Sequence, residues 1–125
     1  MSTPKIIAID DSAEVLQTNQ DVFTKLGCQV VTAGDAKSGF DAVKGNPDAK
    51  LVIIDFELPD KNGMELVEEI CQTIDNPPAM VFLTTKSQNH LAERALELGV
   101  EAWILKPLKE SIAARLVTKF VKVSA

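Results

Sequence analysis

The feature that most constrains the fold is a repeated alternation of short apolar runs and longer amphipathic segments. Five runs consist mainly of apolar residues, at positions 5–9, 28–33, 51–54, 79–83 and 101–105. Runs that are apolar on both faces are typical of parallel strands in a sheet that is covered on both sides. The segments between and after the runs carry apolar residues at helical spacing, so they predict five helices. The chain is therefore expected to be an α/β protein.

Right-handed crossovers leave few topologies for five alternating strands and helices. The prediction is a doubly wound five-stranded parallel sheet of order 2-1-3-4-5, a flavodoxin-like (βα)5 fold, with the strand order reversing between the first and third strands. The 125 residues suit a single domain, 1–125, and the sequence shows no linker or low-complexity segment.

Composition excludes several classes of function. The net charge of −5 argues against a nucleic-acid-binding surface, which needs clustered Lys and Arg. With one histidine and two cysteines, a zinc site is not expected, and Cys28 and Cys71 are predicted to be small buried thiols rather than a disulfide. No signal peptide or membrane-spanning run is present, so a cytoplasmic location is expected.

Polar side chains stand where the predicted strands end. Asp10 and Asp11 follow the first run, Asp55 follows the third, Thr84 the fourth and Lys106 the fifth. The carboxyl ends of parallel strands lie at one edge of a sheet, where ligands of open α/β folds collect. Taken alone, Asp55 is better explained as a cap on the turn that follows it than as a reactive residue. Its convergence with four other polar strand ends favours a reactive site.

Three clustered carboxylates repel one another unless a cation joins them. A hard divalent cation with oxygen ligands fits, and Mg²⁺ is preferred, with Mn²⁺ as the alternative. An aspartate can attack phosphorus to give an acyl phosphate. In that reaction the cation and Lys106 neutralise charge on the transferring group, and Thr84 donates a hydrogen bond to it.

Taken in order, these motifs resemble those of receiver domains of two-component response regulators. The acidic pair is Asp10-Asp11, and the phosphoacceptor motif Asp-x-x-Met/Leu-Pro-x-x-x-Gly is present at 55–63. The Thr or Ser after an apolar strand is Thr84, and the Lys-Pro pair is Lys106-Pro107. The resemblance extends along the whole chain, and the combination is far more specific than any one motif.

The resemblance implies a role for each matching residue. Asp55 is expected to accept a phosphoryl group from a phosphohistidine of a sensor histidine kinase or phosphotransfer protein. Asp11 is expected to bind Mg²⁺ directly, Asp10 mainly through water, and Glu57 through its backbone carbonyl. Thr84 and Lys106 are expected to contact the phosphoryl group. The Lys106–Pro107 peptide bond is expected to be cis.

The resemblance also implies a switch and two surfaces. Trp103 stands where this family usually has a Tyr or Phe. Thr84 is expected to move toward the phosphoryl group, and the Trp103 ring to move into the space that Thr84 leaves. This movement would remodel the face of the fourth helix, fifth strand and fifth helix, which would bind a downstream target. A fixed, half-buried indole is the alternative reading of Trp103. Kinase docking is expected around residues 13–17 and 107–109.

Three residues at the mouth of the site are candidates for setting the lifetime of the phosphoryl group. Thr85 stands where this family commonly has Ala, and it could narrow access to the site. Glu57 and Lys86 are placed to pair across the mouth and block an attacking water, although an exposed pair adds only ~0–1 kcal/mol to stability. His90 is predicted to be a surface residue.

The leading function is a phosphorylation-activated signalling switch that consists of a receiver alone and is not a turnover enzyme. A receiver cut from a longer protein is equally compatible with the sequence. Two other functions stay open: an interaction module of the same fold that no longer uses phosphate, and an Asp-nucleophile phosphohydrolase. The intact set of site residues argues against the first. Glu57 in place of an acid/base Asp, and the lack of room for a cap, argue against the second.

Overall fold

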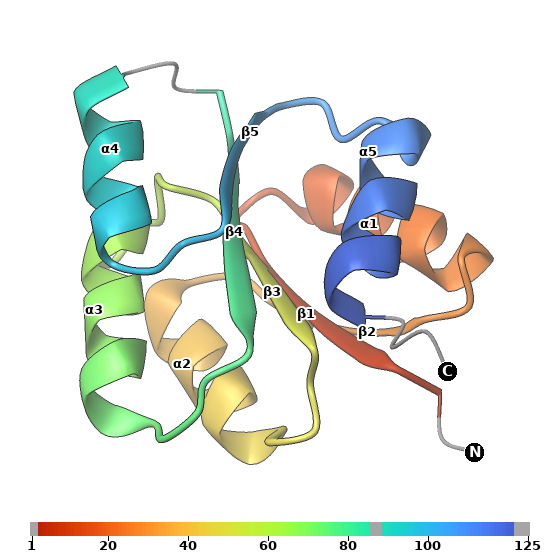
Figure 1. Ribbon diagram of the computed structural model, residues 1–125. Helices are drawn as coiled ribbons and strands as arrows, with labels where there is room; N and C mark the ends of the chain where they lie inside the picture. Colours follow the sequence, from red (N-terminus) through yellow and green to blue (C-terminus); the bar gives the residue numbers. More distant parts are fainter. Residues whose placement is uncertain (1–2, 86–88, 122–125) are drawn as a thin grey trace.

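The computed structural model describes residues 3–85 and 89–121. Strands and helices alternate along the chain (Figure 1). The elements are β1 (Lys5–Ile9), α1 (Ala13–Lys25), β2 (Gln29–Ala33), α2 (Ala36–Gly45), β3 (Leu51–Ile54), α3 (Gly63–Thr73), β4 (Ala79–Thr84), α4 (Asn89–Glu97), β5 (Ala102–Leu105) and α5 (Glu110–Leu116).

The strands form one parallel sheet in the order β2-β1-β3-β4-β5, which confirms the predicted topology. Helices α1 and α5 cover one face of this sheet, and α2, α3 and α4 cover the other (Figure 1). Each face carries its own apolar cluster, one around Phe23 and Leu116 and the other around Phe82 and Ile70. The chain is a three-layer α/β structure.

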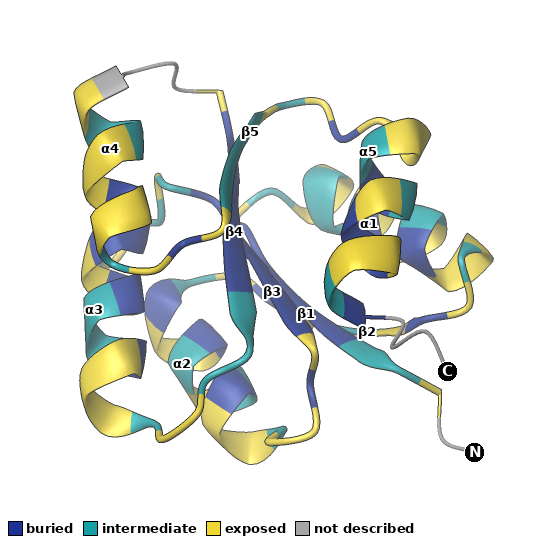
Figure 2. Ribbon diagram, in the orientation of Figure 1, coloured by how far each residue is buried: buried dark blue, intermediate teal, exposed yellow. Residues whose placement is uncertain are grey.

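The depth of burial differs between central and edge strands (Figure 2). In β1, β3 and β4 nearly every residue is buried, as strands apolar on both faces require. The edge strands β2 and β5 are only partly covered, and Leu105 is 49% exposed. Position in the sheet, rather than composition alone, therefore decides burial.

Local sequence explains where the helices begin and end. Ser12 caps α1 by accepting from the backbone N–H of Val15, and Asp35 caps α2 in the same way. Gly27 follows α1 with φ of 89°, a conformation that glycine adopts without strain. The helix α5 continues as a π-helix from Val117 to Val121, where the sequence predicted one regular helix.

Three further predictions concern the burial of single side chains. Cys71 was expected to be buried, but its thiol is exposed on α3 and contacts the backbone carbonyl of Leu98 at 3.8 Å. The helical spacing that placed Cys71 on the apolar stripe puts it at the edge of that stripe, beside the end of α4. Cys28 is buried and reduced, and His90 is exposed, both as predicted.

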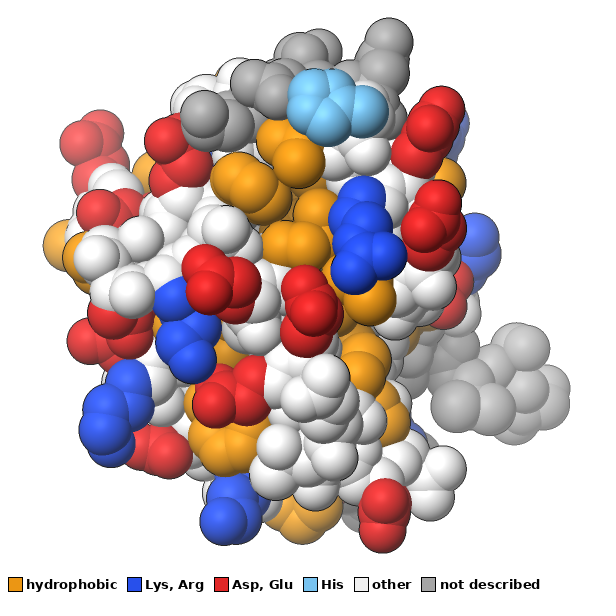
Figure 3. Space-filling model, turned by 90° about the vertical axis from the view of Figure 1, so that its left-hand side faces the viewer, with side chains coloured by type: hydrophobic (Ala, Val, Ile, Leu, Met, Phe, Trp, Pro, Cys, Tyr) orange, Lys and Arg blue, Asp and Glu red, His pale blue; other side chains and the backbone are white. Residues whose placement is uncertain are grey.

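Figure 3 shows the face formed by α3 and α4, where hydrophobic side chains lie between charged ones and the histidine stands at the top. No helix among the described residues has the length and apolar character that crossing a membrane requires.

Candidate functional site

Register in the sheet brings Asp10 and Asp55 together. Ile9 of β1 pairs with Ile54 of β3, so the next residue of each strand lies at the same height. The backbone N–H of Asp55 donates to the carbonyl of Ile9 at 2.9 Å, and that of Asp10 donates to Ala33 at 3.0 Å. The two aspartates therefore extend the ladder by one step and stand side by side at the carboxyl edge.

Three carboxylates gather at this point. One oxygen each from Asp10, Asp11 and Asp55 lies within 4.8 Å of the others. Asp10 and Asp55 are only 2% and 6% exposed, whereas Asp11 faces solvent. A set of carboxylate oxygens that is open to water on one side suits Mg²⁺, which takes one or two carboxylates and keeps several waters. The residues present therefore fit the ion that the sequence predicted.

Lys106 supplies the positive charge at this edge. Its Nζ lies 2.7 Å from Asp10 Oδ2 and 3.1 Å from Asp55 Oδ2, and its side chain is 16% exposed. Its backbone N–H donates to the carbonyl of Thr84 at 2.9 Å, which joins the ends of β4 and β5. The Lys106–Pro107 peptide bond is cis, as expected. The ammonium thus contacts both buried carboxylates at once.

Burial and pairing act against each other in this cluster. Burial raises the pKa of Asp10, and the hydrogen bond from Lys106 and the N–H of Ser12 only partly offset it. Burial would lower the pKa of Lys106, but the bonds to Asp10 and Asp55 and their charges outweigh burial and raise it. The lysine therefore stays charged, and Asp10 holds a proton more readily than an exposed aspartate.

The loop between β3 and α3 is fastened at several points. Asp60 reaches across to α2, where its Oδ1 accepts from the backbone N–H of Ala36 at 2.8 Å and its Oδ2 from that of Lys37 at 2.9 Å. The bond from Ala36 is the main reason that the pKa of Asp60 is lowered. Asn62 and Glu65 form a capping box at the start of α3. The loop that follows Asp55 is thereby held to two helices, α2 and α3.

Gly63 lets this loop approach the core. Its N–H donates to the carbonyl of Phe56 at 2.6 Å. A Cβ at this position would stand 2.6 Å from Phe82 Cε1 and 2.8 Å from the carbonyl oxygen of Asp55. Such distances are too short for any side chain, so glycine is needed for the close approach.

For the remaining predicted site residues, the structure gives position and burial but does not test their predicted roles. Asp55 Oδ1 accepts from the N–H of Glu57 at 3.2 Å, which puts Glu57 beside the site with its side chain exposed. Thr84 ends β4 and is fully buried, and Thr85 is exposed. Lys86 lies outside the described residues. The metal contact of the Glu57 carbonyl and the phosphoryl contact of Thr84 remain predictions.

Trp103 packs into an aromatic group that begins next to Asp55. Its ring centroid lies 5.3 Å from that of Phe82 and 5.7 Å from that of Phe56. The indole is partly buried against the core. Because Phe56 directly follows Asp55, the rings connect the backbone of the site to β5.

Sequence reasoning missed Phe56, Asp60 and a buried polar residue of α1, Asn19. Phe56 could have been found as the aromatic neighbour of Asp55. Asp60 was assigned to turn chemistry, and no local signal reveals a contact 24 residues away. Asn19 carries a signal, since an amide at an inward position of a helix is unusual.

Comparisons with known proteins agree with this geometry. Residues 6–118 match the family model of the response regulator receiver domain. The chemotaxis protein CheY of Thermotoga maritima is 30% identical over 122 residues, which cover 96% of this chain and 97% of that protein. The Regulator of RpoS of Escherichia coli (strain K12) is 33% identical over 107 residues, but the match covers 85% of this chain and only 31% of that protein.

Solved structures show the same fold. A CheY-like receiver domain protein from Methanospirillum hungatei JF-1 has a TM-score of 0.85 at 23% identity, covering 94% of this chain and 93% of that chain. The CheY of a CheX-CheY-BeF3-Mg complex from Borrelia burgdorferi also has a TM-score of 0.85, at 21% identity, covering 92% and 87%. Together with the family match, the acidic cluster and the lysine that pairs with it show that this chain belongs to the response regulator receiver domain family.

Proposed function

We propose that the chain is a phosphorylation-controlled switch whose Asp55 accepts a phosphoryl group from a phosphohistidine of a histidine kinase or phosphotransfer protein. The observation that carries this proposal is the contact of Lys106 with both Asp55 and Asp10 beside a third carboxylate. Membership of a family that serves phosphorylation-based signalling supports it.

In the proposed reaction a carboxylate oxygen of Asp55 attacks phosphorus. The bond between phosphorus and the imidazole nitrogen breaks, a bond between phosphorus and oxygen forms, and the leaving imidazole takes up a proton. Asp10, Asp11, Asp55 and the Glu57 carbonyl would hold Mg²⁺, which would supply positive charge for the phosphoryl oxygens. Lys106 is already beside Asp55, so its ammonium is near a phosphoryl group attached there and donates to one phosphoryl oxygen, and the hydroxyl of Thr84 donates to another.

The output surface proposed for this switch is formed by α4, β5 and α5. Leu96 of α4 is 59% exposed and Leu105 of β5 is 49% exposed, and these are the large apolar residues most open to water among those described. Trp103 lies on the same strand as Leu105 and contacts Phe56. A movement of Thr84 toward the phosphoryl group would change the indole's surroundings and so this face. A downstream protein is the proposed partner.

The proposal has further parts. The chain acts in the cytoplasm, binds neither nucleic acid nor membrane, and catalyses only its own phosphorylation and dephosphorylation. The CheY in the Borrelia burgdorferi structure is in complex with CheX, BeF3 and Mg, and a receiver that uses the same type of chemistry is the simplest reading of the present site. Glu57, Thr85 and Lys86 are proposed to set the lifetime of the phosphoryl group.

One experiment tests the proposal against its alternatives. The protein is incubated with Mg²⁺ and acetyl phosphate and then measured by intact mass, beside Asp55→Asn and the exposed control Asp41→Asn. A single adduct that Asp55→Asn lacks and Asp41→Asn keeps is expected. No adduct in the unaltered protein would favour an interaction module, and turnover of many equivalents would favour a phosphohydrolase.

The lifetime residues are tested by decay of the adduct after the donor is removed. Glu57→Asn and Lys86→Ala are expected to lose the phosphoryl group severalfold faster than the unaltered protein. Equal decay in all three proteins would remove the pair from the proposal, without affecting the role of Asp55.

A further inference from the structure

An Asn–Gly pair stands where the loop after Asp55 enters α3. Asn62 is the N-cap of this helix, and Gly63 is its first residue. Among the five asparagines of the chain, Asn62 is the one that precedes a glycine, whereas Asn46 and Asn76 precede prolines. Glycine has no side chain to shield its backbone nitrogen, which can therefore attack the carboxamide carbon of the asparagine before it, and proline has no N–H to lose. Asn62 is thus the asparagine of this chain with the highest intrinsic tendency to deamidate.

The folded loop holds both of the reacting groups. The Oδ1 atom of Asn62 accepts from the backbone N–H of Glu65 at 2.9 Å, and Glu65 Oε1 accepts from the N–H of Asn62 at 3.2 Å. The N–H of Gly63, whose nitrogen would have to attack, donates to the carbonyl of Phe56 at 2.6 Å. The nitrogen therefore keeps its proton, and the carboxamide stays bound to the first turn of α3, as long as the loop is closed.

Ring closure also needs a different backbone conformation. The product of the attack is a five-membered imide, in which the Gly63 nitrogen lies against the side chain of Asn62. The ψ angle of Asn62 is 163°, an extended value that turns this nitrogen away from that side chain. Gly63 is buried, and it is packed so closely against Phe82 and the carbonyl of Asp55 that a Cβ has no room. The backbone therefore cannot rotate into the reactive geometry unless the loop and the first turn of α3 open together.

We propose that Asn62 is a deamidation site that the fold keeps closed and that reacts only when this segment opens. In the open state the Gly63 nitrogen gives its proton to hydroxide and bonds to the carboxamide carbon of Asn62. The bond from that carbon to the side-chain nitrogen breaks, and ammonia leaves with a proton from water. Water then opens the imide at one of its two carbonyl groups, which leaves aspartate or isoaspartate. The reaction is independent of phosphorylation at Asp55, so it goes beyond the proposed function.

The residues that fix the loop are also those that make it reactive. Gly63 is required by the close approach to the core, and Asn62 supplies the oxygen that caps α3. Isoaspartate routes the main chain through the side chain and so adds one carbon to the backbone before Gly63. The packed backbone has no room for that carbon, so the modified loop cannot regain its bond to Phe56. Deamidation would thus release the loop beside Asp55 irreversibly, at a rate that the capping box sets.

The test measures conversion at Asn62 during incubation at mildly alkaline pH, by peptide mass spectrometry with the isoaspartate form resolved by chromatography. The folded protein is expected to react at least about tenfold more slowly than the same protein unfolded in guanidinium chloride, because local opening has a free-energy cost. Glu65→Ala removes one half of the capping box, so it is expected to react roughly fivefold faster than the unaltered folded protein, as the loss of a helix cap predicts. Asn76, which precedes a proline, is the internal reference and should stay unmodified.

Two variants of the same helix separate protection by the cap from a general loss of stability. Glu65→Gln keeps an oxygen that accepts from the N-cap N–H, so it is expected to react as slowly as the unaltered protein. Glu68→Ala removes a carboxylate of α3 that lies outside the capping box, and it should also leave the rate unchanged. Equal rates in the folded and the unfolded protein, no conversion of Asn62 in the unfolded protein, or equal acceleration by Glu65→Ala and Glu68→Ala would each overturn the proposal.

Discussion

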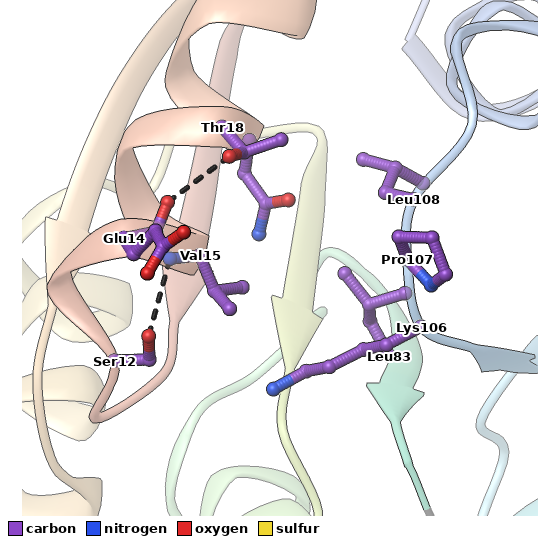
Figure 4. Close-up of a pocket in the computed structure, with 9 residues that line it drawn as sticks. Ser12, Glu14, Val15, Thr18, Leu83, Lys106, Pro107 and Leu108 are labelled. Carbon is purple, nitrogen blue, oxygen red and sulfur yellow. Dashed lines mark hydrogen bonds between the residues drawn. The ribbon is translucent and has the colours of Figure 1, made fainter.

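The two flanks of Asp55 are built in opposite ways. On the braced flank, residues 56–63, Asp60 is bonded to two backbone N–H groups of α2 and Gly63 is bonded back to Phe56. On the open flank, formed by α1 and the loop after β5, lies a pocket of about 370 Å³ that Asn19 helps to line (Figure 4). In the proposed function, the first flank holds oxygen atoms in place for a cation, and the second leaves room for a partner to approach. The rigid flank would thus serve binding of the cation, and the open flank would serve approach of the partner.

The largest expected effect is at Lys106, which joins the flanks. Lys106→Met leaves Asp10 and Asp55 as neighbouring buried charges without a cation. The free energy of unfolding in the absence of Mg²⁺ is expected to fall by about 2 kcal/mol, less than for a fully buried pair because the lysine is partly open to water. Urea denaturation with and without Mg²⁺ measures both states.

The same variant has a second signature. Mg²⁺ is expected to stabilise Lys106→Met more than it stabilises the unaltered protein, because the ammonium no longer competes for the carboxylates. Lys109→Met, an exposed neighbour on the same loop, is the control and should change neither value. A smaller Mg²⁺ effect in Lys106→Met would show that the lysine assists the ion rather than competing with it.

On the braced flank, Gly63→Ala is expected to cost about 2 kcal/mol of unfolding free energy, as overpacking does. The new Cβ would meet Phe82 and the backbone of Asp55, and neither has room to move. Gly45→Ala is the matched control, because nothing lies within 4 Å of a Cβ there and alanine favours a helix. Thermal unfolding followed by circular dichroism gives both values, and equal melting temperatures would contradict the close approach.

The next prediction concerns pH. Burial raises the pKa of Asp10 in the folded protein above its usual 3.8, so a protonated Asp10 favours the folded state over the unfolded chain. The stability that this proton contributes is lost as the pH rises through the pKa of Asp10 in the folded protein. Mg²⁺ needs the carboxylate, so its affinity is expected to fall by up to about tenfold per pH unit below that pKa. Titration calorimetry at several pH values measures this, and Asp10→Asn should flatten the profile. An affinity that does not change with pH would remove Asp10 from the ion's ligands.

Asp60 tests whether bracing matters for the ion. Asp60→Ala is expected to weaken Mg²⁺ binding roughly threefold, because Asp60 acts on the site only through the position of the loop. The loss is smaller than the tenfold or more that follows removal of a residue hydrogen-bonded to a metal ligand. Asp35→Ala removes the other cap of the same helix, where it accepts from the N–H of Ser38, but leaves the loop in place. Mg²⁺ titrations followed by Trp103 fluorescence compare the two variants. An equal loss in both would assign the effect to α2 itself and not to the position of the loop.

The sequence predicted the reactive cluster because the end of each strand can be recognised from neighbouring residues alone. Each strand end is marked by a change from apolar to polar residues, and parallel register brings the ends to one edge, so Asp10, Asp55 and Lys106 had to meet. The central strands were predicted for the same reason. The partial exposure of β5 cannot be read from its apolar run alone, but it agrees with the predicted strand order, which places β2 and β5 at the edges of the sheet.

The two flanks were not predictable, because they depend on contacts between distant segments. Asp60 has the composition of an ordinary turn, and its bond to Ala36 follows only from how the β3–α3 loop lies against α2. The exposure of Cys71 also depends on where α4 ends against α3. Pockets such as the one around Asn19 are shaped by the sum of such placements. Sequence patterns therefore predict where the chemistry lies better than they predict what surrounds it.

The smallest expected effect is on the open flank. The Thr18 side chain is exposed at the pocket, and its hydroxyl bonds only within its own helix, to Glu14. Thr18→Ala is therefore expected to change the free energy of unfolding by no more than about 0.5 kcal/mol, since alanine's better helix propensity offsets the lost contact. Urea denaturation measures the change. A loss well above that value would mean that the open flank is braced by contacts across the pocket, and the contrast between the two sides of Asp55 would then disappear.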